Sequence, residues 1–99
     1  MVKIVWTEIS IDDLKEIFDF IADDSARYAT ITTQKIYQRA QEIIINPYFG
    51  RIVPEFNDKF IRELIEGNYR IIYKIKDELQ VDILRVFHSA RLLKKKSIK

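Results

Sequence analysis

The 99-residue chain contains no cysteine and only one histidine, His88. Without cysteine it can form neither a disulfide framework nor a thiolate metal site. One histidine cannot build a zinc site by itself, so we expect no bound metal and no other cofactor. With only two glycines, the sequence has no glycine-rich phosphate-binding loop. These absences remove most of the catalytic signatures that a sequence can show.

Long hydrophobic runs are also missing. No stretch approaches the roughly 18–20 apolar residues that a membrane span needs. The first ten residues, MVKIVWTEIS, lack the long apolar core of a signal peptide. We therefore expect a cytoplasmic protein with no membrane partner. With 47% hydrophobic and 32% charged residues, the chain is predicted to form one domain over residues 1–99.

The net charge of +2 conceals an uneven distribution of charge. Residues 1–24 carry seven acidic and two basic side chains, a net charge of −5. Residues 25–99 carry fifteen basic and eight acidic side chains, a net charge of +7, and the last fifteen residues contain no acid at all. Such a basic region is typical of proteins that bind RNA or DNA, and equally of a solvated tail that keeps a protein soluble.

The first half of the chain predicts a strand followed by two helices. Residues 2–7 are mostly β-branched or aromatic, which indicates a short strand. Apolar residues then recur at helical spacing after Ser10, the predicted cap, and again over about twenty residues after Ser25. Asn46-Pro47 ends the second helix, because proline disfavours helix in the residue before it. The link between the helices is very short, so we expect an antiparallel hairpin.

After an irregular segment, residues 47–59, the period of the hydrophobic pattern changes to two. The predicted strands are residues 60–65, 69–75 and 79–87, joined by turns short enough for consecutive hairpins. The order β-α-α-β-β-β indicates an α+β fold, with the helix hairpin packed on one face of a small antiparallel sheet. The segment after Phe87 is predicted to be a short terminal helix or a frayed tail.

Basic side chains on the strand at residues 69–75 are candidates for a binding surface. Arg70 and Lys74 share one face of this strand with Ile72, while its tyrosines and other isoleucines point to the opposite, core face. The Arg70 face is therefore expected to be open, with Arg70 and Lys74 roughly 13 Å apart, a spacing that suits a nucleic-acid backbone. Arginine can grip a phosphate with two hydrogen bonds. An ordinary exposed arginine would give the same pattern.

Metal-independent RNA cleavage needs a base, an acid and positive charge that stabilises the transition state. His88 directly follows the last predicted strand, and histidine exchanges protons near neutral pH. Glu55 lies in the irregular segment and is the other candidate for acid or base. Arg70 would supply the charge, together with Arg62 as its expected inter-strand neighbour. A structural or merely solvated role for each of these residues is the alternative.

Four motifs follow one another in the second half of the chain: GRIVPE from Gly50, IRELI from Ile61, NYRIIY from Asn68 and VFHSAR from Val86. In this order and spacing, from Gly50 to Leu93, they resemble the RelE/ParE toxin superfamily. The resemblance implies the toxin of a type II toxin–antitoxin module, neutralised by a cognate antitoxin that wraps an extended or helical segment around it. RelE-like and YoeB-like members bind the ribosome and cut mRNA without metal, whereas ParE-like members inhibit DNA gyrase.

The resemblance also implies roles for individual residues. In the YoeB-like pattern the catalytic positions fall on Glu55, Arg70 and His88. The expected RNA contacts are the basic residues Arg62, Lys74 and Arg91. In that pattern a tyrosine follows the histidine, whereas here the residue is Ser89, a departure that keeps gyrase inhibition open as an alternative. The sequence therefore predicts ribosome-dependent mRNA cleavage, with gyrase inhibition by binding as the alternative.

Overall fold

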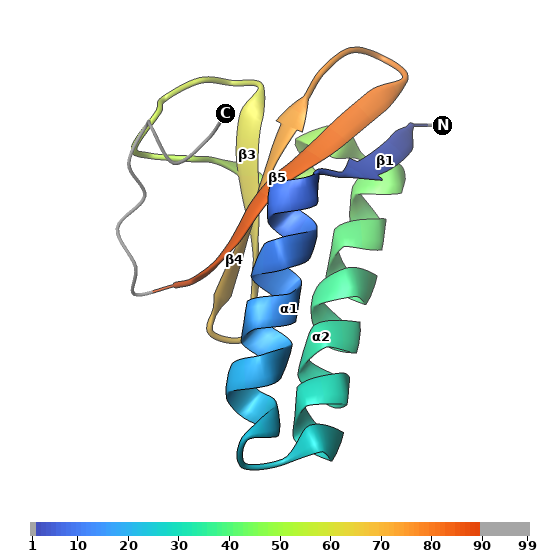
Figure 1. Ribbon diagram of the computed structural model, residues 1–99. Helices are drawn as coiled ribbons and strands as arrows, with labels where there is room; N and C mark the ends of the chain where they lie inside the picture. Colours follow the sequence, from blue (N-terminus) through green and yellow to red (C-terminus); the bar gives the residue numbers. More distant parts are fainter. Residues whose placement is uncertain (1, 90–99) are drawn as a thin grey trace.

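The computed structural model describes residues 2–89, so the predicted terminal helix or tail and the candidate Arg91 lie outside the described residues. A hairpin of two helices packs against one face of a five-stranded sheet (Figure 1), which confirms the predicted α+β fold. The elements in chain order are β1 (Lys3–Trp6), α1 (Glu8–Ala22), α2 (Ala26–Gln41), the short 3-10 helices η1 (Glu42–Ile44) and η2 (Pro47–Phe49), and the strands β2 (Arg51–Ile52), β3 (Ile61–Glu66), β4 (Tyr69–Ile75) and β5 (Gln80–His88).

The sheet is mixed rather than wholly antiparallel as expected. Its strand order is β1-β5-β4-β3-β2, and every neighbouring pair is antiparallel except β1 and β5, which run parallel. No hairpin joins β1 to β5, so nothing in the local sequence determines their relative direction. The two-residue strand β2 lies within the segment that was predicted to be irregular. Its pairing with β3 adds a short edge to the predicted meander.

The helix caps differ in one place from the prediction. Thr7, and not Ser10, caps α1: its hydroxyl accepts a hydrogen bond from the Ser10 amide at 3.2 Å. The Thr7 hydroxyl also donates to the Ile83 carbonyl at 2.8 Å, so the start of α1 is tied to β5. Ser25 caps α2 as predicted, and its hydroxyl accepts from the Tyr28 amide at 3.1 Å. Ser10 instead lies inside the first turn of α1, where its hydroxyl donates to the Thr7 carbonyl at 2.7 Å.

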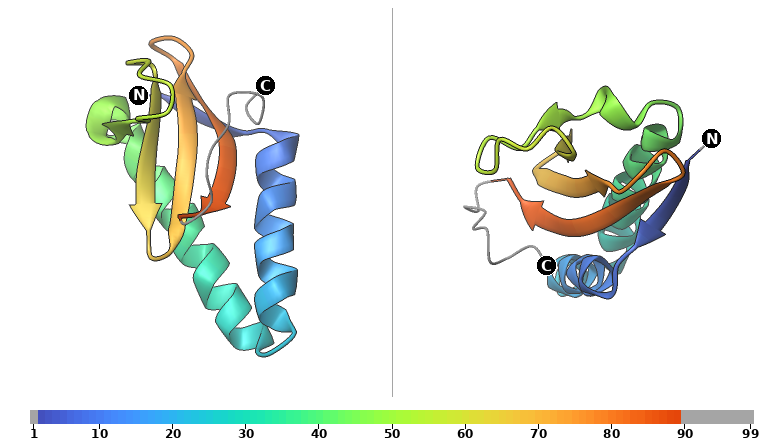
Figure 2. Two further views of the ribbon diagram at one scale, coloured as in Figure 1. Left: turned by 90° about the vertical axis from the view of Figure 1, so that its left-hand side faces the viewer. Right: turned by 90° about the horizontal axis from the view of Figure 1, so that it is seen from above.

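Hydrophobic side chains are buried on both faces of the sheet. The larger core lies between the sheet and the helices and consists of Ile36, Ala40, Ile43, Leu64, Ile71, Tyr73, Ile75, Val81, Ile83 and Val86. A smaller core of Val53, Ile72 and Phe87 lies on the opposite face, which was expected to be open. The segment between β2 and β3 contributes Val53 and thereby covers part of that face. Figure 2 shows that the helix hairpin extends beyond the sheet at its far end.

The buried hydroxyl of Tyr73 organises the start of β2. It donates to the Pro47 carbonyl at 2.6 Å and accepts from the Gly50 amide at 3.0 Å. A Cβ atom at Gly50 would lie 2.6 Å from both the Glu63 carbonyl oxygen and the Tyr73 hydroxyl, so only glycine fits. This close approach explains the glycine that opens the GRIVPE motif.

Tyr73 predicts a loss of stability at alkaline pH. Burial raises the pKa of its hydroxyl above the ordinary value of 10.0. Because the folded state holds this proton more tightly than the unfolded state, the contribution to stability is complete below about pH 10 and is lost as the pH rises through the folded-state pKa. We expect Tyr73→Phe to lack this loss of stability at alkaline pH. At neutral pH we expect it to be less stable than wild type by about 1–3 kcal/mol, because the Gly50 amide loses its hydrogen-bond acceptor. Urea unfolding of wild type and Tyr73→Phe from neutral to alkaline pH measures both effects. If the free energy of unfolding of the two proteins changes with pH in parallel, Tyr73 does not cause the alkaline loss of stability.

Candidate functional site

Four charged side chains form a network on the sheet face away from the helices. The Arg70 guanidinium donates from Nε to Glu63 Oε1 at 2.6 Å, and from its two terminal nitrogens to the Glu55 carboxylate at 2.9 and 3.0 Å. The second oxygen of Glu63 accepts from Arg51 Nε. Strands β2, β3 and β4 supply three of these residues, and the segment between β2 and β3 supplies Glu55. The network therefore attaches that segment to the sheet.

This network is buried at its centre and balanced in charge. The Glu63 side chain is fully buried and that of Arg70 is 8% exposed, whereas that of Arg51 is 65% exposed. The hydrogen bonds to Glu55 raise the pKa of Arg70, and Glu63 adds to the effect. Two guanidinium groups thus face two carboxylates, in contrast to the free cationic surface that the sequence predicted. The expectation that Arg70 lies open is wrong, because the segment carrying Glu55 folds over it.

The predicted catalytic residues are only partly brought together. Glu55 and Arg70 are in direct contact. His88 lies on the other face of the sheet: it pairs with Tyr69 in the β4–β5 register, whereas Arg70 pairs with Phe87. The His88 and Tyr69 rings meet edge to face, with centroids 5.7 Å apart. Because neighbouring residues of a strand point to opposite faces, His88 and Arg70 do not converge on one phosphate.

Arg62 also lies apart from Arg70. Its register partner in β4 is Tyr73, while the β3 residues that share the Arg70 face are Glu63 and Ile65, so the expected neighbourhood of Arg62 and Arg70 is wrong. The Arg62 guanidinium donates to three backbone carbonyls, those of Tyr48, Gly50 and Lys59. Lys74 does lie on the Arg70 face and is exposed, as predicted.

Two buried carboxylates were not singled out from the sequence. Glu63 shares a strand face with Ile61 and Ile65, and Asp13 lies four residues from Ile9 and Ile17 along α1. In each case an acidic residue stands at a position where the hydrophobic pattern of the strand or helix predicts an apolar one, and this departure could have identified Glu63 and Asp13 from the sequence. Asp13 accepts two hydrogen bonds from the Arg85 side chain, at 2.8 and 3.0 Å, and joins α1 to β5.

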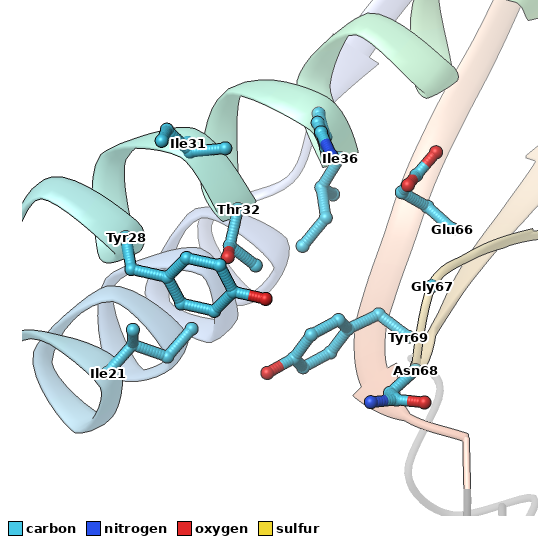
Figure 3. Close-up of a pocket in the computed structure, with 10 residues that line it drawn as sticks. Ile21, Tyr28, Ile31, Thr32, Ile36, Glu66, Gly67, Asn68 and Tyr69 are labelled. Atoms are coloured by element: carbon cyan, nitrogen blue, oxygen red, sulfur yellow. The ribbon is translucent and has the colours of Figure 1, made fainter. Parts of the chain in front are cut away.

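A cavity of about 230 Å³ lies where the helix hairpin extends beyond the sheet. Tyr28 of α2 and Tyr69 of β4 point toward each other across it (Figure 3). Ile21, Ile31 and the buried Ile36 supply apolar walls. Tyr28 is 61% exposed, so the hairpin presents an incompletely covered apolar surface here.

Within residues 2–89, no three side chains of the types that ligate metals are grouped to hold a metal ion. Over the same residues, neither helix combines the length and the apolar character needed to cross a membrane.

Comparison with solved structures shows which known proteins share this fold. The fold matches the chromosomal ParDE TA system from P. aeruginosa with a TM-score of 0.74 and 21% identity, over 89% of this chain and 96% of that chain. It also matches the YoeB/ParE toxin from Agrobacterium tumefaciens with a TM-score of 0.60 and 18% identity, over 88% of this chain and 98% of that chain. The chain thus shares its fold with these two toxin structures, as the sequence motifs indicated.

The family itself is shown by a sequence model. The model described as "ParE toxin of type II toxin-antitoxin system, parDE" matches residues 4–93, nearly the whole chain. The chain belongs to this family of toxins. No match was found among curated proteins.

Proposed function

We propose that this ParE-family toxin arrests growth by binding DNA gyrase rather than by cutting mRNA. The observation that carries the proposal is the placement of the predicted catalytic residues: Arg70 is enclosed by Glu55 and Glu63, and His88 is on the opposite face of the sheet. Two further points support this proposal. The chain belongs to the ParE family, whose members the sequence resemblance associates with gyrase inhibition, and Ser89 stands where the nuclease pattern has a tyrosine.

The chemistry of the charge network argues against a nuclease. A transition-state stabiliser must direct its donors at the reacting phosphate, whereas three Arg70 donors are committed to carboxylates. Both oxygens of Glu55 accept hydrogen bonds from the Arg70 guanidinium, so this carboxylate is also engaged within the network. Such a network is suited to holding a surface rigid for binding.

Ribosome-dependent mRNA cleavage is the second candidate function. The direct contact between Glu55 and Arg70 favours it, because these two of the three predicted catalytic residues lie together. Displacement of Glu55 by a phosphate would be needed before Arg70 could grip the message.

Paired assays on one toxin preparation distinguish the two functions. We expect the toxin to inhibit DNA supercoiling by purified gyrase, and to leave mRNA intact in a cell-free translation reaction followed by primer extension. A toxin that binds rather than cuts should act in proportion to its occupancy of the target, so we expect near-complete inhibition at saturating toxin. Normal supercoiling at toxin excess, with message cut at ribosomes, would reverse the assignment.

We also propose that a cognate antitoxin neutralises the toxin by covering the cavity between α2 and β4. The uncovered apolar side chains there suit a helical or extended apolar segment.

Tyr28→Ser is expected to weaken antitoxin binding by about tenfold, the effect of losing a well-packed interface tyrosine, without altering toxicity. Isothermal titration calorimetry with the antitoxin measures the affinity. The other exposed tyrosine of α2, Tyr37, is not a suitable control position because its ring stacks on Trp6. Thr30 is exposed on the same helix, so Thr30→Ser serves as the control variant. If Tyr28→Ser and Thr30→Ser bind the antitoxin with equal affinity, the antitoxin covers another surface.

A further inference from the structure

The edge of the sheet formed by η2, β2 and the start of β3 carries aromatic side chains that face solvent. Tyr48 is 50% exposed, Phe49 is 56% exposed and Phe60 is 40% exposed. Tyr48 and Phe60 line the same surface pocket. Single exposed apolar residues are ordinary, but a group of large ones within residues 48–60 marks a surface that another molecule covers.

A cation lies over each of these rings. The Arg62 guanidinium is 5.0 Å from the Tyr48 ring centroid, and the Lys59 ammonium is 5.1 Å from that of Phe60. The Arg39 guanidinium is 5.5 Å from the Phe49 ring. We call these three pairs the aromatic–cation edge. Stacking holds the cations in place before any partner binds, which reduces the conformational entropy lost on binding.

The charge of the edge indicates the chemistry of its partner. Arg39 forms a salt bridge with Glu42, but within residues 2–89 neither Lys59 nor Arg62 forms one. The Arg62 guanidinium is held by backbone carbonyls, which do not neutralise its charge, so the rings are flanked by two positive charges without a carboxylate partner among these residues. They are complementary to carboxylates on a partner surface.

The neighbouring side chains favour a protein over a nucleic acid. Ile45, just before η2, is 87% exposed, and Ile52 in β2 is 37% exposed. Bases stack on aromatic rings and not on branched aliphatic chains, whereas protein interfaces bury both kinds. Tyrosine and arginine, which meet here as Tyr48 and Arg62, are the residues that most often dominate protein–protein affinity.

We propose that the aromatic–cation edge is the surface through which the toxin binds its target, and that it fits an acidic protein surface with an apolar centre. The inference rests on the proposed function, in which that target is gyrase. It reassigns Arg62 from RNA contact to protein contact. The edge lies at the start of β3, and the cavity proposed for the antitoxin lies beyond its end, so the two surfaces can be separated by substitution.

The test compares supercoiling inhibition by wild-type toxin, Tyr48→Ser and Lys59→Glu, with Phe20→Ser as the matched control. Phe20 is a 79% exposed aromatic residue on α1, far along the chain from the edge. We expect the toxin concentration for half-inhibition to rise about tenfold in each edge variant and to stay unchanged in Phe20→Ser. Circular dichroism and antitoxin affinity equal to wild type verify that every variant is folded.

The possible results separate the inference from the proposed function. If wild-type toxin leaves gyrase active, the proposed function fails. If wild type inhibits and both edge variants inhibit equally well, the edge is not the target surface and the function stands. A labelled single-stranded DNA oligonucleotide is titrated in parallel by fluorescence anisotropy. Binding to wild type that is lost in Tyr48→Ser would overturn the protein partner in favour of a nucleic acid.

Discussion

Replacing Asp13 by alanine is expected to lower the free energy of unfolding by about 3–5 kcal/mol, as when one partner of a buried ion pair is removed. Asp13 is 6% exposed and accepts a bidentate pair of hydrogen bonds from Arg85. The same carboxylate accepts from the Val86 amide at 2.9 Å. Its hydrogen bonds raise the pKa of Arg85. One substitution therefore removes the acceptor of both a guanidinium and a buried amide.

The position of Asp13 explains why the loss is so large. Strand β1 pairs with β5 only as far as Ile83. Beyond that point the Asp13 carboxylate takes the place of a strand partner for the Val86 amide and holds α1 against the sheet. Without it, water must reach a buried amide or the helix must move.

Urea unfolding measures this effect, and Asp12→Ala is the matched control. Asp12 is the preceding residue of the same helix and is exposed. Its substitution is expected to change stability by less than about 0.5 kcal/mol. Similar unfolding midpoints for the two variants would show that the Asp13 contacts contribute little.

Replacing Arg70 by alanine is expected to cost about 3–5 kcal/mol, because the fully buried Glu63 carboxylate loses its buried partner. Arg51→Ala removes the other arginine bound to Glu63, but its side chain is mostly exposed, so the expected cost is only about 0–1 kcal/mol. Chemical denaturation of the two variants compares a buried and an exposed partner of one carboxylate. Equal losses would mean that burial does not determine the strength of this network.

A double variant, Arg70→Met with Glu63→Leu, separates stability from function. Well-packed apolar residues often replace a buried ion pair without loss of stability, so we expect the double variant to recover most of the deficit of Arg70→Ala. If the toxin acts by binding gyrase through the aromatic–cation edge, the folded double variant should still inhibit supercoiling. A folded double variant that no longer arrests growth would instead give Arg70 a direct role in the activity.

The periodicity of the sequence was sufficient to predict the two helices and four of the five strands, but not β2 or the parallel pairing of β1 with β5. Apolar residues at helical spacing and then at period two predicted the hairpin and the strands, and the short link after α1 made the helices antiparallel. The face of β4 that packs on the helices was also predicted, since Tyr69, Ile71 and Tyr73 alternate with a face that carries Arg70 and Lys74. These properties depend on local spacing, which the chain carries in its own order.

The candidate site could be predicted only in part. The resemblance put Glu55 and Arg70 in one catalytic set, and in the structure the two side chains are in contact. The sequence could not show that the contact neutralises Arg70, because that depends on Glu63 in a neighbouring strand and on the fold of the segment after β2. The side of the sheet on which His88 lies depends on the β4–β5 register, which includes a shift at Ile72/Tyr73.

By itself, then, the sequence determined the α+β class, the helix hairpin and the toxin family, because these follow from periodicity and from motifs close together in the chain. Because the chain has no cysteine, the sequence also determined that it cannot form a disulfide or a thiolate metal site. Only the tertiary structure decided that Arg70 is enclosed, that Asp13 anchors α1, and that Arg62 lies over Tyr48 at the edge. Each of these contacts joins residues from different elements, and the energy of a buried charge depends on which partner the fold brings to it.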